Sequence, residues 1–131
     1  DSIRESDWKG DIQIYCVDNA SKDGSPDWLR KHYGGHEWFH LIQMGKNSGF
    51  SAANNVGLHM AVDAGCNYLM ILNNDTCIER DMIRKLVDRA EGKSCIVAPK
   101  IYYWDRKRMH LFKWLLYALF RTNVPSGRGY E

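Results

Sequence analysis

Long apolar runs and an excess of one charge are both missing from this sequence of 131 residues. No run reaches the roughly 18 apolar residues that a membrane-spanning helix needs. Lysine and arginine number 18 against 16 aspartate and glutamate residues, which gives a net charge of +2. Proteins that bind nucleic acids usually carry a clear excess of basic residues, so we expect no nucleic acid partner here.

Closely spaced cysteines and two common phosphate-binding motifs are also absent. Cys16, Cys66, Cys77 and Cys95 lie far apart, with no C-x-x-C pair. This spacing disfavours a disulfide framework or a zinc site and predicts reduced, mostly buried thiols in a cytoplasmic protein. The chain contains neither G-x-x-x-x-G-K-[ST] nor G-x-G-x-x-G, which disfavours P-loop and classical dinucleotide-binding domains.

Strand and helix patterns alternate along the chain. Apolar segments at 11–17, 38–44, 67–73 and 94–100 predict strands. Helices are expected from Ser25, as an N-cap followed by proline, from Phe50 to Gly65, and from Met82. The sequence therefore predicts one α/β domain with a mostly parallel sheet and helices on both faces.

The segment "KNSGFSAANNVG", at 46–57, is a poor helix start if stability alone counts. Asparagine and glycine are weak helix formers and contribute little core area. Two explanations stay open at this point. The small residues could let a ligand approach the backbone, or they could serve capping and close packing of a helix on a sheet.

Polar clusters follow three of the predicted strands. They are Asp18-Asn19, the segment 46–49 and the segment 73–76. Ligands of parallel sheets bind beyond the carboxyl ends of the strands, so we expect Asp18 and Asp75 on one rim. Turn chemistry is the alternative for each cluster taken alone. The Asn-Asn-Asp of 73–75 offers the oxygen ligands that Mg²⁺ or Mn²⁺ prefers.

Three of these motifs match a family when taken together. "VDNASKDGSPDWL", "NSGFSAANNVG" and "YLMILNNDT", in this order and spacing, resemble family-2 glycosyltransferases of the GT-A fold, of the rhamnosyltransferase type. The resemblance covers residues 1–100. It implies inverting transfer of a sugar from a UDP- or dTDP-sugar to the hydroxyl of a glycan or lipid-linked acceptor, with Mg²⁺ or Mn²⁺.

The resemblance also assigns roles to residues. Asp18 matches the aspartate that contacts the nucleotide base, and Asp75 matches the metal-binding carboxylate of the D-x-D motif, whose first position is Asn73 here. One carboxylate fewer implies weaker metal binding until the donor diphosphate completes the site. The full set of expected donor-binding residues is Asp18, Asn19, Asp23, Asn47, Gly49, Asn54, Asn73 and Asn74.

Some parts of the family pattern are not found in this sequence. A first strand is expected before Asp1, placed between the strands that end at Asp18 and Asn73, and the motif with the catalytic base is expected beyond Glu131. We therefore expect a piece of a longer protein, with donor binding in 1–100 and the start of an acceptor-side region in 101–131. Expressed alone, this piece should be inactive and marginally stable.

Other interpretations remain. A phosphoacceptor receiver domain would use Asp18, Asp75 and Lys100, but it has Lys-Pro where this chain has Pro99-Lys100. A non-catalytic nucleotide-binding remnant is the third class. The apolar, aromatic segment 109–122, flanked by basic residues, either contacts the inner face of a membrane or packs against other parts of the protein.

Overall fold

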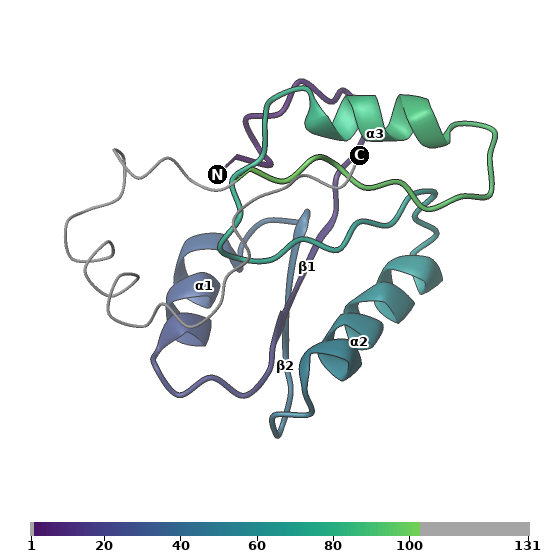
Figure 1. Cartoon of the computed structure of the whole chain (residues 1–131). Helices are drawn as coiled ribbons and strands as arrows, with labels where there is room; N and C mark the ends of the chain where they lie inside the picture. Colours follow the sequence, from purple (N-terminus) through teal and green to yellow (C-terminus); the bar gives the residue numbers. More distant parts are fainter. Residues whose placement is uncertain (1, 103–131) are drawn as a thin grey trace. The chain divides into compact units, whose positions relative to one another are not determined.

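The computed structural model describes residues 2–102 of the chain. The chain divides into two compact units, Asp1–Val87 and Asp88–Glu131. The first unit contains β1 (Ile14–Asp18), α1 (Ser25–Tyr33), β2 (Phe39–Gln43) and α2 (Phe50–Asp63), and α3 (Met82–Ala90) begins within it (Figure 1). The fold class is α/β, as the sequence predicts.

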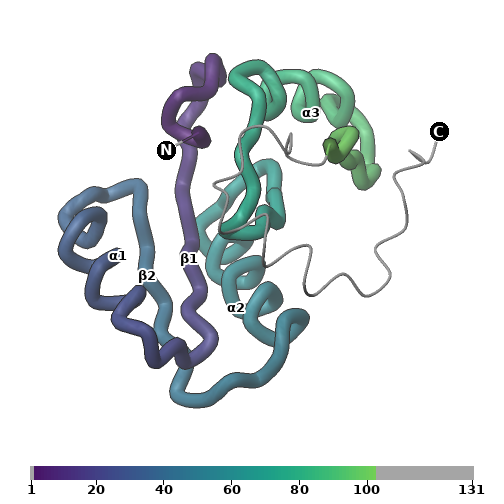
Figure 2. Tube along the Cα trace, turned by 60° about the vertical axis from the view of Figure 1, so that its left-hand side comes forward, coloured from purple at the N-terminus to yellow at the C-terminus, as the bar shows by residue number. Residues whose placement is uncertain are grey.

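The sheet of the first unit has two parallel strands, β1 and β2. Their register pairs Ile14 with Phe39 and Asp18 with Gln43, so both strands end at the same edge. In two views the strands lie between α1 and α2, with α1 against β2 and α2 against β1 (Figures 1 and 2). Helices on both faces of a parallel sheet were the predicted arrangement.

Helix α1 begins where its sequence predicts, but with different capping. Gly24, with φ +79°, is the N-cap, so Ser25 is the first helical residue and not the cap. The Ser25 hydroxyl instead donates to Asp23 Oδ1 at 2.6 Å. Proline at the second helical position is tolerated because its missing N–H has no intrahelical acceptor there.

Helix α2 packs on β1 through its small residues. Ala53 and Ala61 are buried, and a Cβ added at Gly57 would lie 3.1 Å from Val17 Cγ2. These positions recur every four residues, so they form one close-packed stripe. Phe50, on the same predicted arc, is 67% exposed, which was not expected. Inside the helix, the small residues therefore serve helix–sheet packing.

The predicted strands at 67–73 and 94–100 are wrong for this structure. Neither segment pairs with a neighbour, although both have apolar sequences. A strand needs a hydrogen-bonded partner, and no partner for either segment exists among the described residues. The unpaired segment 67–73 leaves large side chains about half exposed, namely Tyr68, Leu69, Met70 and Ile71.

The beginning of the chain folds against the first unit's later residues. Residues 2–5 form turns, with Ser6 N–H donating to Ile3 C=O at 3.2 Å. Asp7 N–H then donates to the carbonyl of Arg80 at 2.8 Å. Ile78, next to this contact, is one of the few buried apolar residues.

The second unit is described as far as Tyr102. Lys93 closes α3 by donating its Nζ to Arg89 C=O, as expected for a cation near a helix end. The ammonium of Lys100 lies 5.3 Å from the ring centre of Tyr102. No helix within residues 2–102 has the length and hydrophobicity needed to cross a membrane. The segment 109–122 and the expected acceptor-side region from 103 onward lie outside the described residues.

The cysteines differ from prediction in burial. All four are free, as expected, and all lie within the described residues. Cys16 and Cys66 are half-buried, whereas Cys77 and Cys95 are exposed. The expectation of mostly buried thiols is therefore wrong.

Candidate functional site

The carboxyl ends of β1 and β2 bring two polar loops together. Met44 N–H donates to Asp18 C=O at 2.9 Å, which extends the pairing of the strands by one residue. The loop after β1 begins with Asn19, and the loop after β2 contains Asn47, Ser48 and Gly49. Residues that are about 30 apart in sequence therefore become neighbours at one edge of the sheet.

Asp18 is a buried carboxylate at this edge, with 8% of its surface exposed. Within the described residues, its side chain accepts from the backbone N–H of Ser21, at 3.2 Å to Oδ1 and 3.3 Å to Oδ2. Burial, together with the negative charge of Asp18, raises the pKa of the Cys16 thiol two residues earlier on the strand. A buried carboxylate with a single donor retains lone pairs for further N–H groups.

The side chain of Asn19 connects the two loops. Its Oδ1 accepts from Ser48 N–H at 2.9 Å, and its Nδ2 donates to Asn47 Oδ1 at 3.0 Å and to Gly49 C=O at 3.3 Å. Asn47 Oδ1 also accepts from Gly49 N–H at 3.0 Å. We call these residues, Asn19, Asn47, Ser48 and Gly49, the loop junction. Most of its amide groups satisfy one another, so its first role is to fix the shape of the backbone.

Gly49 links the loop junction to helix α2. It is the N-cap, with φ +87° and ψ 167°, a conformation essentially restricted to glycine. No side chain caps the helix, so the first-turn N–H groups of α2 lack a side-chain acceptor. Free N–H groups at a helix N-terminus favour a negatively charged group.

Asp23 and Asn54 were also predicted to bind the donor. Asp23 Oδ1 accepts from the Ser25 hydroxyl and from Ser25 N–H, and these hydrogen bonds lower the pKa of the Asp23 carboxyl. Asp23 is exposed at the start of α1. Asn54 is half-buried within α2, one residue after buried Ala53. Among the described residues, no side-chain hydrogen bond joins either of them to the loop junction.

The predicted metal-binding segment is not part of this cluster. Asn73 C=O accepts from the N–H and the hydroxyl of Thr76, which closes a turn around Asn74 and Asp75. Asp75 is exposed and follows no strand, so the expected shared rim of three strand ends is formed by two strands only. No hydrogen bond or ion pair joins 73–75 to the loop junction within the described part of the chain.

Asp75 nevertheless suits a metal by its chemistry. Its carboxylate is exposed and makes no hydrogen bond or ion pair within residues 2–102, so it is available as a ligand. Among those residues no group of three or more histidine, cysteine, aspartate or glutamate side chains could hold a metal ion. A single carboxylate with amide oxygens needs ligand oxygens from elsewhere, as Mg²⁺ sites with bound phosphates have.

The sequence did not reveal two sets of contacts, one at the sheet edge and one after Asp75. The backbone N–H groups of Ser21 and Ser48 complete the surroundings of Asp18 and Asn19, and backbone donors leave no trace in residue type. Asp7 and Arg84, which anchor the segment after Asp75, are 77 residues apart. The catalytic base expected beyond Glu131 lies outside the described residues.

Comparisons with known proteins identify the family of this chain. The model of the family described as "Glycosyl transferase family 2" matches residues 1–127. A dTDP-rhamnosyl transferase, RfbF, of Shigella flexneri is 26% identical over 76 residues, 58% of this chain and 25% of that protein. The low-salt glycan biosynthesis hexosyltransferase Agl10 of Haloferax volcanii is 29% identical over 94 residues, 70% of this chain and 29% of that protein.

The chain thus spans under a third of each of these two relatives. No solved structure matches it. The family match extends over nearly the whole sequence, including the strand ends and the loop junction. The chain belongs to glycosyl transferase family 2.

Proposed function

We propose that this chain forms the donor-binding part of a glycosyltransferase. The whole enzyme would transfer a sugar from a nucleotide-diphosphate donor to a glycan or lipid-linked acceptor, with inversion and with a divalent metal. The observation that carries the proposal is the buried carboxylate of Asp18, with one N–H donor, beside a loop junction fixed in shape. A dTDP-sugar is the favoured donor, because one relative is named as a dTDP-rhamnosyl transferase, and a UDP-sugar is the alternative.

Each residue has a defined task in this proposal. Asp18 would accept a hydrogen bond from the N–H of a uracil or thymine ring. Asn47 Nδ2, which makes no hydrogen bond within the described residues, and the backbone beside Gly49 would contact the nucleotide. The uncapped first turn of α2 would face negative charge on the diphosphate.

Asp75, with the side-chain oxygens of Asn73 and Asn74, would hold Mg²⁺ or Mn²⁺. The bound metal would neutralise charge on the departing diphosphate. The acceptor hydroxyl would attack the anomeric carbon from the side opposite the diphosphate, which inverts the configuration. A general base outside the described residues would take the hydroxyl proton. We place the reaction in the cytoplasm, with contact to the inner membrane face through 109–122 as an added hypothesis.

Substitution of Asp18 tests the proposal. In the complete enzyme, Asp18→Asn keeps the shape and the acceptor for Ser21 but removes the charge. We expect the KM for the donor to rise about tenfold, because hydrogen bonds to charged groups are worth about 1.5–3 kcal/mol, while kcat changes little. Asp27→Asn is the matched control, since Asp27 is an exposed carboxylate paired with Arg30 on α1.

An unchanged donor KM in Asp18→Asn would contradict the assignment of Asp18. Labelling of Asp75 by acetyl phosphate, without nucleotide binding, would favour the receiver-domain interpretation instead. Nucleotide binding without transfer by the complete enzyme would favour a non-catalytic remnant.

A further inference from the structure

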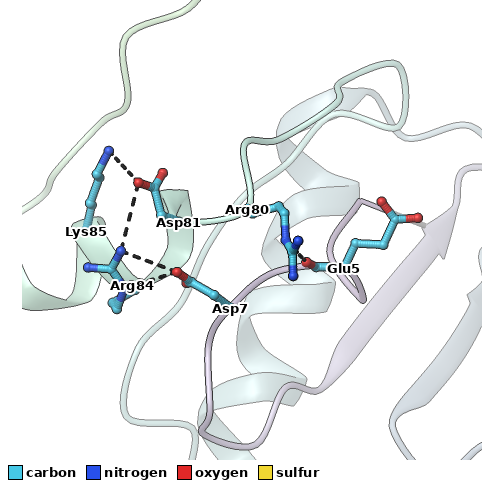
Figure 3. A network of polar contacts seen from close by, with 6 residues as sticks. All are labelled: Glu5, Asp7, Arg80, Asp81, Arg84 and Lys85. Atoms are coloured by element: carbon cyan, nitrogen blue, oxygen red, sulfur yellow. Dashed lines mark hydrogen bonds and ion pairs between the residues drawn. The ribbon is translucent and has the colours of Figure 1, made fainter.

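The beginning of the chain binds the segment that follows the proposed metal ligand. Ser2 Oγ accepts from Ile78 N–H at 3.3 Å. Glu5 C=O accepts from Arg80 Nε at 3.2 Å, and Asp7 N–H donates to Arg80 C=O at 2.8 Å. Figure 3 shows Arg80 and Glu5 in contact across the two segments. Residues 2–7 thus hold residues 78–80 through both backbone and side chains.

An ion pair continues this contact into α3. Arg84 Nε and Nη2 both donate to Asp7 Oδ2, at 3.3 Å each. Arg84 Nη2 also lies 3.9 Å from Asp81 Oδ2, and Asp81 Oδ2 lies 2.6 Å from Lys85 Nζ. The four side chains form a row of alternating charge (Figure 3).

Asp7 contributes both its backbone and its side chain to this contact. Its amide N–H is bonded to Arg80 and its Oδ2 to Arg84, while its Oδ1 is enclosed without a partner among the described residues. Both side chains of the ion pair are more than a third exposed, so the pair contributes little to global stability. Its main effect is therefore on the position of the segments that it joins.

Within the described residues, the hydrogen bonds around Asp75 stay inside its own turn. The preceding residues, 67–73, pair with no strand, and the turn at Asn73–Thr76 is held by its own residues. Ile78 is three residues beyond Asp75, and it is both buried and hydrogen-bonded to Ser2. The attachment of 78–84 to residues 2–7 is thus the nearest fixed point for Asp75.

We propose that Asp7 and Arg84 are positioning residues for the proposed metal site, because their ion pair fixes 78–84 and thereby the Asp75 turn. This inference rests on the proposed function, since it assigns Asp75 a metal. It predicts that loosening the pair weakens metal binding more than it weakens the fold.

The test uses Mn²⁺ with UDP as the probe and the complete enzyme. Asp7→Asn removes the charge of the pair, and Arg84→Lys removes its two converging N–H groups. Because an exposed ion pair contributes little free energy, we expect Mn²⁺ binding to weaken about three- to fivefold in each. The melting temperature should stay close to that of Asp27→Asn, an exposed ion-pair control on α1.

Two further measurements separate positioning from general destabilisation. Hydrogen exchange of amides at 73–78 should be faster in Asp7→Asn than in the wild type, with exchange in α2 unchanged. The double variant Asp7→Arg/Arg84→Asp, which restores a pair of opposite charges, should recover part of the Mn²⁺ affinity.

The outcomes are distinguishable. If the wild type binds Mn²⁺ and Asp75→Asn abolishes this binding, but Asp7→Asn and Arg84→Lys stay within twofold of the wild type, the positioning role is wrong and the metal site stands. Unchanged exchange at 73–78 in Asp7→Asn likewise overturns the positioning role. If the wild type binds no Mn²⁺ with UDP, the metal site is wrong and the role of the pair at that site falls with it.

Discussion

The polar residues at the edge of the sheet and those at the end of the segment 67–75 are held in position differently. At the sheet edge, two paired strands deliver Asp18 and the loop junction to one place, and Asn19 fixes both loops by hydrogen bonds. The segment 67–75 has the more apolar sequence but no strand partner, and its polar turn closes on itself. The geometry of the sheet edge is fixed by hydrogen bonds between its own two loops. The position of the turn at 73–76 depends instead on residues 2–7 and 78–84.

This difference separates two kinds of contribution to one proposed site. The loop junction is pre-shaped, so substitutions there should act on the binding of the nucleotide. Asp75 is exposed in a turn that follows no strand, so it contributes charge more than shape.

Loss of the Asp75 carboxylate should have the largest effect. In the complete enzyme, Asp75→Asn should reduce metal-dependent turnover by on the order of 100-fold or more, because the charge that holds the metal at the diphosphate is removed. The measurement is the transfer rate as a function of Mn²⁺ concentration, with circular dichroism to verify folding. Asp63→Asn, at the exposed end of α2, is the control. A wild-type rate at low Mn²⁺ would remove Asp75 from the metal site.

The backbone of Gly49 provides the next test. Gly49→Ala should cost about 2 kcal/mol, because φ +87° with ψ 167° is strained for any residue with a Cβ. An added Cβ meets no atom within 4 Å, so strain and not collision is the cause. The donor affinity should fall about tenfold as the loop junction distorts. Gly35→Ala is the matched control, since Gly35 is equally open but has no left-handed φ. Equal effects at the two glycines would contradict this account of the loop junction.

Substitution of Gly57, where α2 packs on β1, should have a smaller effect than substitution of Gly49. Gly57→Leu should destabilise the protein by about 1.5 kcal/mol, because the added side chain collides with Val17, whose Cγ2 is 3.1 Å from the Cβ position. Urea denaturation measures this, with Gly35→Leu as the control. Adding Val17→Ala should recover part of the loss. Full stability of Gly57→Leu would mean that α2 lies further from β1.

Cysteine reactivity should show the smallest difference. Burial and the negative charge of Asp18 raise the pKa of Cys16, so its thiolate fraction near pH 8 is reduced. Cys77, after the unpaired segment, is exposed. Alkylation by iodoacetamide, followed by mass spectrometry, should modify Cys77 several-fold faster than Cys16. Raising the pH should increase the rate at Cys16, because more thiolate forms. Equal rates would contradict the tighter packing of β1.

The sequence predicts local elements of this fold better than distant pairings. The starts of α1 and α2 and the strand β2 follow from proline, glycine and apolar patterns within a few residues. The strand predicted at 67–73 fails because pairing is decided by a neighbour that its own pattern cannot specify. The polar residues Asp18, Asn19 and Asn47 could be selected from position alone, but the mutual hydrogen bonds of the asparagines and the Asp7–Arg84 pair required the structure.

The location of nucleotide binding is the most direct test of the account. Backbone amide NMR of the labelled complete enzyme, titrated with UDP and with dTDP, reports which residues sense the ligand. The proposal predicts the largest saturable shifts at Asn19, Ser21, Ser48 and Gly49, the backbone around Asp18 and in the loop junction. Shifts confined to other parts of the chain, or no saturable shift with either nucleotide, would contradict it.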